Sequence, residues 1–264
     1  MFVTLITDCD SSNDFGRQEN RIIHLFGNVP ITPISISFGG TVEAAGNLID
    51  MMNASEGDEG VIMVNAAPRH GQAKKWPNGT PFGYFTYKNT LIVATIDEYC
   101  LSLAKKYNVL TEVHVTDIPT VLDEMIKQKR LDPTLRDIIV NSQFRSFDYM
   151  PRLTKWLNDG ISVPHTTKPV SEIPDIPQCI WLVDGFGNCK TTVFPEEVNH
   201  TPGKTLTTKF GEIMCYNRLK DVPNDQPGII IGSAGFDKKR LLEVVVQGKS
   251  AAQKFNLKAG SEIF

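Results

Sequence analysis

Two patterns of apolar and polar positions alternate along roughly the first half of the chain. Short apolar runs that end in a polar loop are typical of buried strands, and apolar residues recurring every three or four positions are typical of helices that cover a sheet. The predicted strands cover residues 2–7, 31–36, 60–64, 90–94 and 112–115. The predicted helices cover 16–27, a stretch capped by Thr41, a stretch ending near 106, and 118–129. This order predicts a largely parallel sheet flanked by helices.

The pattern changes near residue 160. Residues 132–159 look mostly helical, with a break near Pro151, whereas 161–178 hold four prolines among serines and threonines and show no hydrophobic period. Such a segment predicts a linker. Short β-like runs follow at 179–184, 191–194, 205–208, 229–232 and 241–246. We therefore expect an N-terminal α/β domain over residues 1–160 and a small all-β barrel or sandwich over residues 179–264.

Composition narrows the class of protein. The 264 residues are 41% hydrophobic and 22% charged with a net charge of −3, so no basic excess indicates a nucleic-acid partner. The five cysteines are scattered, without a C-x-x-C pair, which argues against a disulfide framework or a structural zinc site. The start of the chain lacks a basic leader and no apolar run reaches 18 residues. We expect a soluble cytoplasmic protein without a membrane partner.

A polar loop with the sequence DCDSSND follows the first predicted strand, at residues 8–14. Its carboxylates, Asp8 above all, allow three kinds of chemistry. They can chelate Mg²⁺ or Ca²⁺, supply a nucleophile for phosphoryl transfer, or accept hydrogen bonds from the diol of a ribose. A turn whose carboxylates cap the next helix is the purely structural alternative.

A second loop, with the sequence DGFGN, follows the apolar run at 180–183. Its glycines allow a tight turn and a close approach to a ligand. Phe186 can stack on a purine ring, and the amide of Asn188 offers both a donor and an acceptor to the edge of adenine. A hairpin corner with a buried phenylalanine is the structural alternative. Farther along, Ser233 follows another strand, where its hydroxyl and nearby backbone N–H groups can bind a carboxylate.

Two further places offer acid–base groups. His114 lies near the end of the predicted strand 112–115, where an imidazole can act as a base or orient water. The loop after the strand 60–64 carries Arg69, His70 and Lys74, which can hold an anion or lower the pKa of a bound water. A structural histidine and a solvated basic loop are the respective alternatives.

These motifs together resemble one family. The chain is similar to the S-adenosyl-L-methionine (SAM) hydroxide adenosyltransferases, or SAM hydrolases, which are relatives of the SAM-dependent fluorinase and chlorinase. The family's T-D-F-G-x-x-D opening resembles residues 7–13, its D-x-F-G-N loop matches 184–188, its N-S-x-G strand resembles 232–235, and its F-H-G-R-D segment resembles 113–117. The tail at 248–260 is also similar. The resemblance covers essentially the whole chain, in order.

The resemblance implies an activity and a set of roles. SAM is cleaved to adenosine and L-methionine, with SAM as the substrate and without a separate cofactor or a metal. Asp8 holds the ribose hydroxyls and Asn13 is a further substrate-binding residue of the same loop. Phe186 and Asn188 bind the adenine. Asp184 meets the methionine amino group and Ser233 the carboxylate. The family is usually a homotrimer, with each site between two subunits.

The chain departs from the family pattern in the loop V-D-P-G-V-G-T-x-R, whose Asp and Arg act with the histidine on water. The Asp position holds Ala67 and the Arg position holds Lys74, while His114 remains. The second Asp of the first loop is either shifted or replaced by Asn13. We expect a SAM hydrolase in which His114 and Lys74 serve catalysis. The alternatives are a non-catalytic SAM- or adenosine-binding protein, a halide-using relative, and a metal-dependent phosphatase or nucleoside hydrolase.

Overall fold

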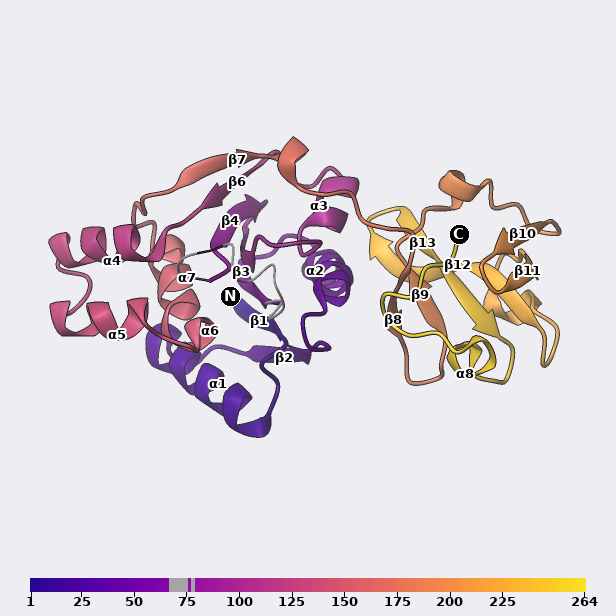
Figure 1. Cartoon of the computed structure of the whole chain (residues 1–264), viewed down its shortest axis with the longest axis horizontal. Helices are drawn as coiled ribbons and strands as arrows, with labels where there is room; N and C mark the ends of the chain where they lie inside the picture. The colour runs from indigo at the N-terminus through magenta and orange to yellow at the C-terminus, as the bar shows by residue number, and fades with distance from the viewer. Residues whose placement is uncertain (67–75, 77–78) are drawn as a thin grey trace. The chain divides into compact units, whose positions relative to one another are not determined.

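The computed structural model describes residues 1–66, 76 and 79–264. The chain forms two compact units, Met1–Pro174 and Asp175–Phe264 (Figure 1). Each has its own hydrophobic core, and each is described by itself.

The N-terminal unit is built on a seven-stranded sheet within the described part of the chain, in the order β2-β1-β3-β5-β4-β6-β7. The strands are β1 (Phe2–Thr7), β2 (Ile31–Ser35), β3 (Gly60–Asn65), β4 (Phe82–Tyr87), β5 (Thr90–Thr95), β6 (Glu112–Val115) and β7 (Thr166–Pro169). β1, β2, β3 and β5 are parallel, and β4 lies antiparallel between β5 and β6. The carboxyl ends of β1, β3, β5 and β6 therefore meet at one edge of the sheet.

Helices cover both faces of this sheet (Figure 1). They are α1 (Ser12–Phe26), α2 (Thr41–Ser55), α3 (Ser102–Lys106), α4 (Ile118–Lys127), α5 (Arg136–Val140), α6 (Arg145–Asp148) and α7 (Met150–Asn158), with short 3-10 turns η2 (Pro133–Leu135) and η3 (Val170–Glu172). Alternate strand residues such as Leu5, Met63 and Val93 pack with apolar side chains of α4 and α7. The helix α2 packs on β1 and β3. This layering buries both faces of the parallel strands, as their continuous apolar runs require.

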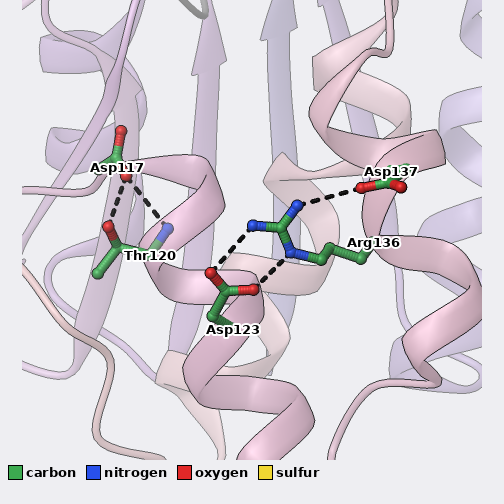
Figure 2. Close-up of polar contacts among 5 residues, drawn as sticks. All are labelled: Asp117, Thr120, Asp123, Arg136 and Asp137. Carbon is green, nitrogen blue, oxygen red and sulfur yellow. Dashed lines mark hydrogen bonds and ion pairs between the residues drawn. The ribbon is translucent and has the colours of Figure 1, made fainter.

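Hydrogen bonds from side chains fix where the helices begin. The Ser11 hydroxyl accepts from the backbone N–H of Asp14 at the start of α1. Asp117 caps α4 by accepting from the backbone N–H of Thr120 at 3.1 Å and from its hydroxyl at 2.6 Å (Figure 2). The prediction that Thr41 caps α2 is wrong, because Gly40 occupies the cap position. The Thr41 hydroxyl instead donates to the carboxylate of Glu98.

The C-terminal unit is mainly antiparallel β-structure. A four-stranded sheet has the order β12-β13-β9-β8, and β10 pairs with β11 in a separate hairpin. The strands are β8 (Ile180–Val183), β9 (Cys189–Thr191), β10 (Thr205–Thr208), β11 (Gly211–Met214), β12 (Pro227–Phe236) and β13 (Lys239–Val246). The 3-10 turns η4 (Pro195–Val198) and η5 (Leu219–Asp221) lie in connections between strands, and α8 (Ala251–Phe255) follows β13. The predicted fold class, an α/β domain followed by a small β domain, is confirmed.

Most of the segment predicted as a linker belongs to the N-terminal unit. Residues 161–174 lie in that unit, and β7 pairs antiparallel with β6, with Thr166 opposite Val115 and Pro169 opposite Glu112. β7 lies at the end of the sheet order, where a proline does not remove a needed ladder hydrogen bond. Its side chains are largely exposed, which is why the segment shows no apolar alternation.

Within the described ranges, no helix has the length and apolar character needed to cross a bilayer.

Candidate functional site

Asp8 is the first residue after β1, and its carboxylate is held from two sides. One oxygen accepts from the Asn65 side-chain amide at 3.1 Å, and the other accepts from the backbone N–H of Gly39 at 3.2 Å. The backbone N–H of Asp8 also donates to the Asn65 carbonyl. Asn65 ends β3, and Gly39 lies in the loop between β2 and α2. Three neighbouring strands thus orient one carboxylate at the carboxyl edge of the sheet, where α/β proteins bind ligands.

The other polar groups of this first loop face elsewhere. Asp10 accepts a hydrogen bond from the Ser35 hydroxyl, so it does not share the partners of Asp8. Asn13 is exposed in the first turn of α1, and within the described ranges no hydrogen bond joins it to Asp8. Among the described residues, no group of three or more His, Cys, Asp or Glu side chains is placed to hold a metal ion.

Two neighbours of Asp8 were not predicted from the sequence. Asn65 is buried and supplies the amide donor described above. Phe38 precedes Gly39, whose N–H binds the carboxylate, and exposes 68% of its surface. A polar residue at the end of a buried apolar strand was the available signal for Asn65. The aromatic ring of Phe38 gave no such signal, because its exposure depends on the folded loop.

His114 lies on β6 within a group of three rings. The centroid of the His114 ring is 5.0 Å from that of Tyr84, which pairs with His114 from the neighbouring strand β4. It is 4.4 Å from the ring centroid of His165. The Nδ1 atom of His114 is buried and has no hydrogen-bond partner among the described residues. Its Nε2 atom lies 3.7 Å from the carboxylate of Glu112. The imidazole is therefore held mainly by ring packing.

His165, which the sequence analysis did not select, has a defined orientation. Its Nδ1 lies 2.9 Å from the Val163 carbonyl and 3.0 Å from the Tyr84 hydroxyl. A carbonyl only accepts hydrogen bonds, so Nδ1 carries a proton and Nε2 is the basic nitrogen of the neutral ring. Burial raises the pKa of Tyr84, which keeps that hydroxyl protonated at neutral pH.

The sheet order separates His114 from Asp8. The strands β3, β5 and β4 lie between β1 and β6. At about 4.8 Å per strand, the two residues are roughly 19 Å apart along the sheet. The described residues therefore do not bring the two into contact. Ala67, Arg69, His70 and Lys74 lie outside the described residues.

Two hollows occur at this edge of the N-terminal unit. A cavity of about 360 Å³ lies at the end of β6 and the start of β7, with Val115, Asp117, His165 and Thr166 among its walls. A more polar hollow of about 550 Å³ includes residues 96–99, which follow β5. Trp76 borders both. Their size is that of small-molecule sites.

The second predicted loop is a tight hairpin between β8 and β9. One oxygen of Asp184 accepts from the backbone N–H groups of Phe186 and Asn188, both at 2.9 Å, and the other accepts from the Asn188 side-chain amide at 3.1 Å. Asp184 thus orders the loop and orients Asn188. Phe186 exposes 83% of its surface at the tip, so the alternative of a buried corner phenylalanine is wrong.

Gly187 ties the hairpin to the start of α8. Its carbonyl accepts from the backbone N–H of Ala252, and its φ of 81° lies in the left-handed region. An added Cβ would lie 2.5 Å from the Cβ of Ser250 and 2.9 Å from its Cα. Only glycine fits here without strain.

Ser233 lies in β12 where the pairing with β13 is interrupted between Ile231 and Gly235. The irregularity leaves Ser233 exposed outside the regular ladder. A guanidinium nitrogen of Arg240 donates to the carbonyls of Ser233 and Gly235, each at 3.3 Å. The sequence analysis missed Arg240, whose charge beside a hydroxyl suits a carboxylate ligand.

Comparison with protein families bears directly on these loops. Residues 178–264 match the family described as the SAM hydroxide adenosyltransferase C-terminal domain. The match covers the C-terminal unit and about a third of the whole chain. The match confirms the resemblance suggested by the sequence motifs, and it covers Asp184, Phe186, Asn188 and Ser233. These residues are therefore similar to a domain of a SAM-related enzyme family.

Solved structures extend the comparison to the whole fold. An uncharacterized conserved protein from Thermotoga maritima is similar with a TM-score of 0.69 at 17% identity, over 99% of this chain and 98% of that one. A conserved hypothetical protein from Thermus thermophilus gives a TM-score of 0.65 at 17% identity, over 100% and 99%. At this identity the likeness shows a shared fold. Comparison with curated proteins gave no match.

Proposed function

We propose that this protein is an enzyme that cleaves SAM to adenosine and L-methionine, with water or hydroxide attacking the ribose C5′. The observation that carries the proposal is the hairpin 184–188 inside the matched domain. It presents an exposed aromatic ring beside an amide that a carboxylate holds in place. A ring for stacking and an amide for hydrogen bonds are what an adenine base requires.

The other ligand groups follow from the chemistry of SAM. Asp8 accepts hydrogen bonds from the ribose hydroxyls, for which Asn65 and Gly39 have already oriented it. Asp184 carries the negative charge that suits the methionine amino group. Ser233, with Arg240 beside it, suits the methionine carboxylate.

Water activation is the demanding step. When the bond between C5′ and the sulfonium sulfur breaks, methionine leaves as a neutral thioether. The enzyme therefore mainly has to position a water and partly desolvate it. We assign this task to His114 and Lys74, with no separate cofactor and no metal. Since alanine stands at position 67, one acid–base partner is missing, which slows such a step by about 10²- to 10⁴-fold.

A second candidate is a SAM- or adenosine-binding protein without turnover. The packing of His114 favours it. The ring packs against Tyr84 and His165, its Nδ1 is buried, and three strands separate it from Asp8. A histidine packed in this way can stabilise the fold without taking part in the reaction.

The test is incubation of the pure protein with SAM, with and without EDTA, followed by chromatography of adenosine and methionine. We expect equal amounts of both products, unaffected by EDTA. Loss of activity in EDTA would instead favour a metal-dependent hydrolase. SAM binding measured by calorimetry without any product would favour the second candidate, and absence of both binding and turnover would refute both.

Two measurements refine the assignment. The variant His114→Ala should lower turnover far more than SAM affinity, and equal losses in both would make His114 a binding or structural residue.

We also propose a homotrimer that acts on a small-molecule substrate. Light scattering on the full chain measures the mass, and a monomeric mass at which activity persists would contradict the trimer.

A further inference from the structure

Three arginines gather on the surface where α1 packs against α6 and α7. We call Arg17, Arg21 and Arg152 the arginine cluster. The guanidinium carbons of Arg17 and Arg21 lie 4.5 Å and 4.2 Å from the centroid of the same Phe147 ring. The two charges are therefore within about 9 Å of each other, and a single aromatic ring holds both in position.

The third member adds to this positive charge. The Nε of Arg152 donates to the Asp148 backbone carbonyl at 3.1 Å. Burial lowers the pKa of Arg152, the charge of Arg21 lowers it further, and the charge of Asp148 acts in the opposite direction. The Asp148 carboxylate itself accepts a hydrogen bond from the Ser142 hydroxyl at 2.5 Å. The charge of Asp148 thus acts on Arg152.

The hydrogen bonds of the arginine cluster are incomplete. The Nη1 atom of Arg21 is inaccessible to solvent and meets no acceptor among the described residues. Within the same ranges, none of the three arginines forms an ion pair. A buried donor that is part of a charged group is costly without an acceptor, so the protein leaves the hydrogen bonds of Arg21 incomplete.

Other cations of this unit show the contrast. Arg136 donates to the Asp123 carboxylate through two nitrogens and to Asp137 through a third (Figure 2). Lys155, which is also on α7, donates to both carboxylate oxygens of Asp159 at 2.5 and 2.6 Å. The fold supplies carboxylates to these cations and leaves the arginine cluster without an equivalent.

We propose that the arginine cluster is a binding site for an oxyanion of the phosphate class, either free or as the phosphate group of a small molecule. A guanidinium stacked on a phenylalanine keeps its N–H edge turned outward, where it can bind two oxygens at once. A phosphate group carries about −1.5 to −2 charges at pH 7, which complements the positive charge of the arginine cluster. This site lies outside the groups assigned to SAM.

The first experiment measures the thermal midpoint of the full chain in increasing inorganic phosphate, with chloride keeping the ionic strength constant. We expect phosphate to raise the midpoint of the unmodified protein and of the control Arg136→Gln. The variants Arg21→Gln and Arg152→Gln should bind phosphate about 10- to 100-fold more weakly, because each loses charged hydrogen bonds. An equal response in Arg21→Gln and the unmodified protein would overturn the proposal.

The second experiment needs no variant. In a ¹⁵N-labelled sample, phosphate should shift the Nε–Hε signals of the three cluster arginines and leave that of Arg136 in place. Equal shifts at all arginines, or no shift at any, would overturn the assignment. Acetate is the comparison ligand, and an equal effect of acetate would refute the preference for phosphate. Neither experiment depends on SAM binding, so failure of one proposal leaves the other standing.

Discussion

The most direct test of the hairpin at 184–188 is the replacement of Gly187 by alanine. Its φ of 81° costs a residue with a side chain about 1–2 kcal/mol. The new Cβ would also lie 2.5 Å from the Cβ and 2.9 Å from the Cα of Ser250. Because the Cα is backbone, rotation of the serine cannot relieve the clash, and overpacking of this kind costs about 1–3 kcal/mol.

We therefore expect Gly187→Ala to lower the free energy of unfolding of the C-terminal unit by about 2–5 kcal/mol. Gly185→Ala is the matched control from the same loop, since its Cβ meets nothing within 4 Å and its φ lies outside the left-handed region. Urea denaturation followed by circular dichroism compares the two variants. SAM titration of the variants that remain folded should show weaker binding only for Gly187→Ala.

The reasoning fails if the two alanine variants unfold within about 0.5 kcal/mol of each other, which is the ordinary range for surface substitutions. Such a result would mean that the contact between Gly187 and the start of α8 does not constrain the hairpin. If both variants were equally stable and both lost SAM affinity, the substitutions would act on contacts with the ligand and would leave the fold unaffected.

Three further predictions concern single residues. Asn188→Ala should weaken SAM binding by about 1–3 kcal/mol through the lost adenine contact, and unchanged affinity in calorimetry would refute that assignment. Cys9 is half-buried while the other four cysteines are buried, and burial raises the pKa of Cys100 and Cys189 to about 12, so iodoacetamide should modify Cys9 first. If Asp8 binds the ribose, adenosine should slow the modification of Cys9. Equal rates of modification with and without adenosine, measured by mass spectrometry, would count against ribose binding by Asp8. Hydrogen bonds from Arg136 lower the pKa of Asp123, so this contact stabilises the fold at neutral pH and is lost as pH falls below about 4. The pKa of Asp123 in an NMR titration should therefore rise in Arg136→Gln, and an unchanged midpoint would show that the contact is absent in solution.

Strands that are buried on both faces were predicted from their continuous apolar runs. β1 and β3 are continuous apolar runs and were found within one residue of their ends. β4 was missed because its sequence, FGYFTY, mixes a glycine with aromatic residues and follows a stretch without a clear period. β7 was missed because its side chains are mostly exposed, so nothing in its composition separates it from a linker.

The site was predictable in its residue types and less so in their roles. The sequence located Asp184, Phe186 and Asn188, but it could not show that the Asp184 carboxylate orders the hairpin through three hydrogen bonds. It also could not pair Asp8 with Asn65, since 57 positions separate them and only the parallel register of β1 and β3 brings them together. Contacts of this range depend on the fold.

The position of β7 at the end of the sheet has a consequence for how the chain can be divided. A fragment cut after residue 160 would leave β6 as a bare strand, with its row of N–H and C=O groups free to recruit another copy. A fragment that continues to Pro174 keeps β7 and closes that row. The segment that resembles a spacer in composition therefore also protects the N-terminal unit against edge-to-edge aggregation.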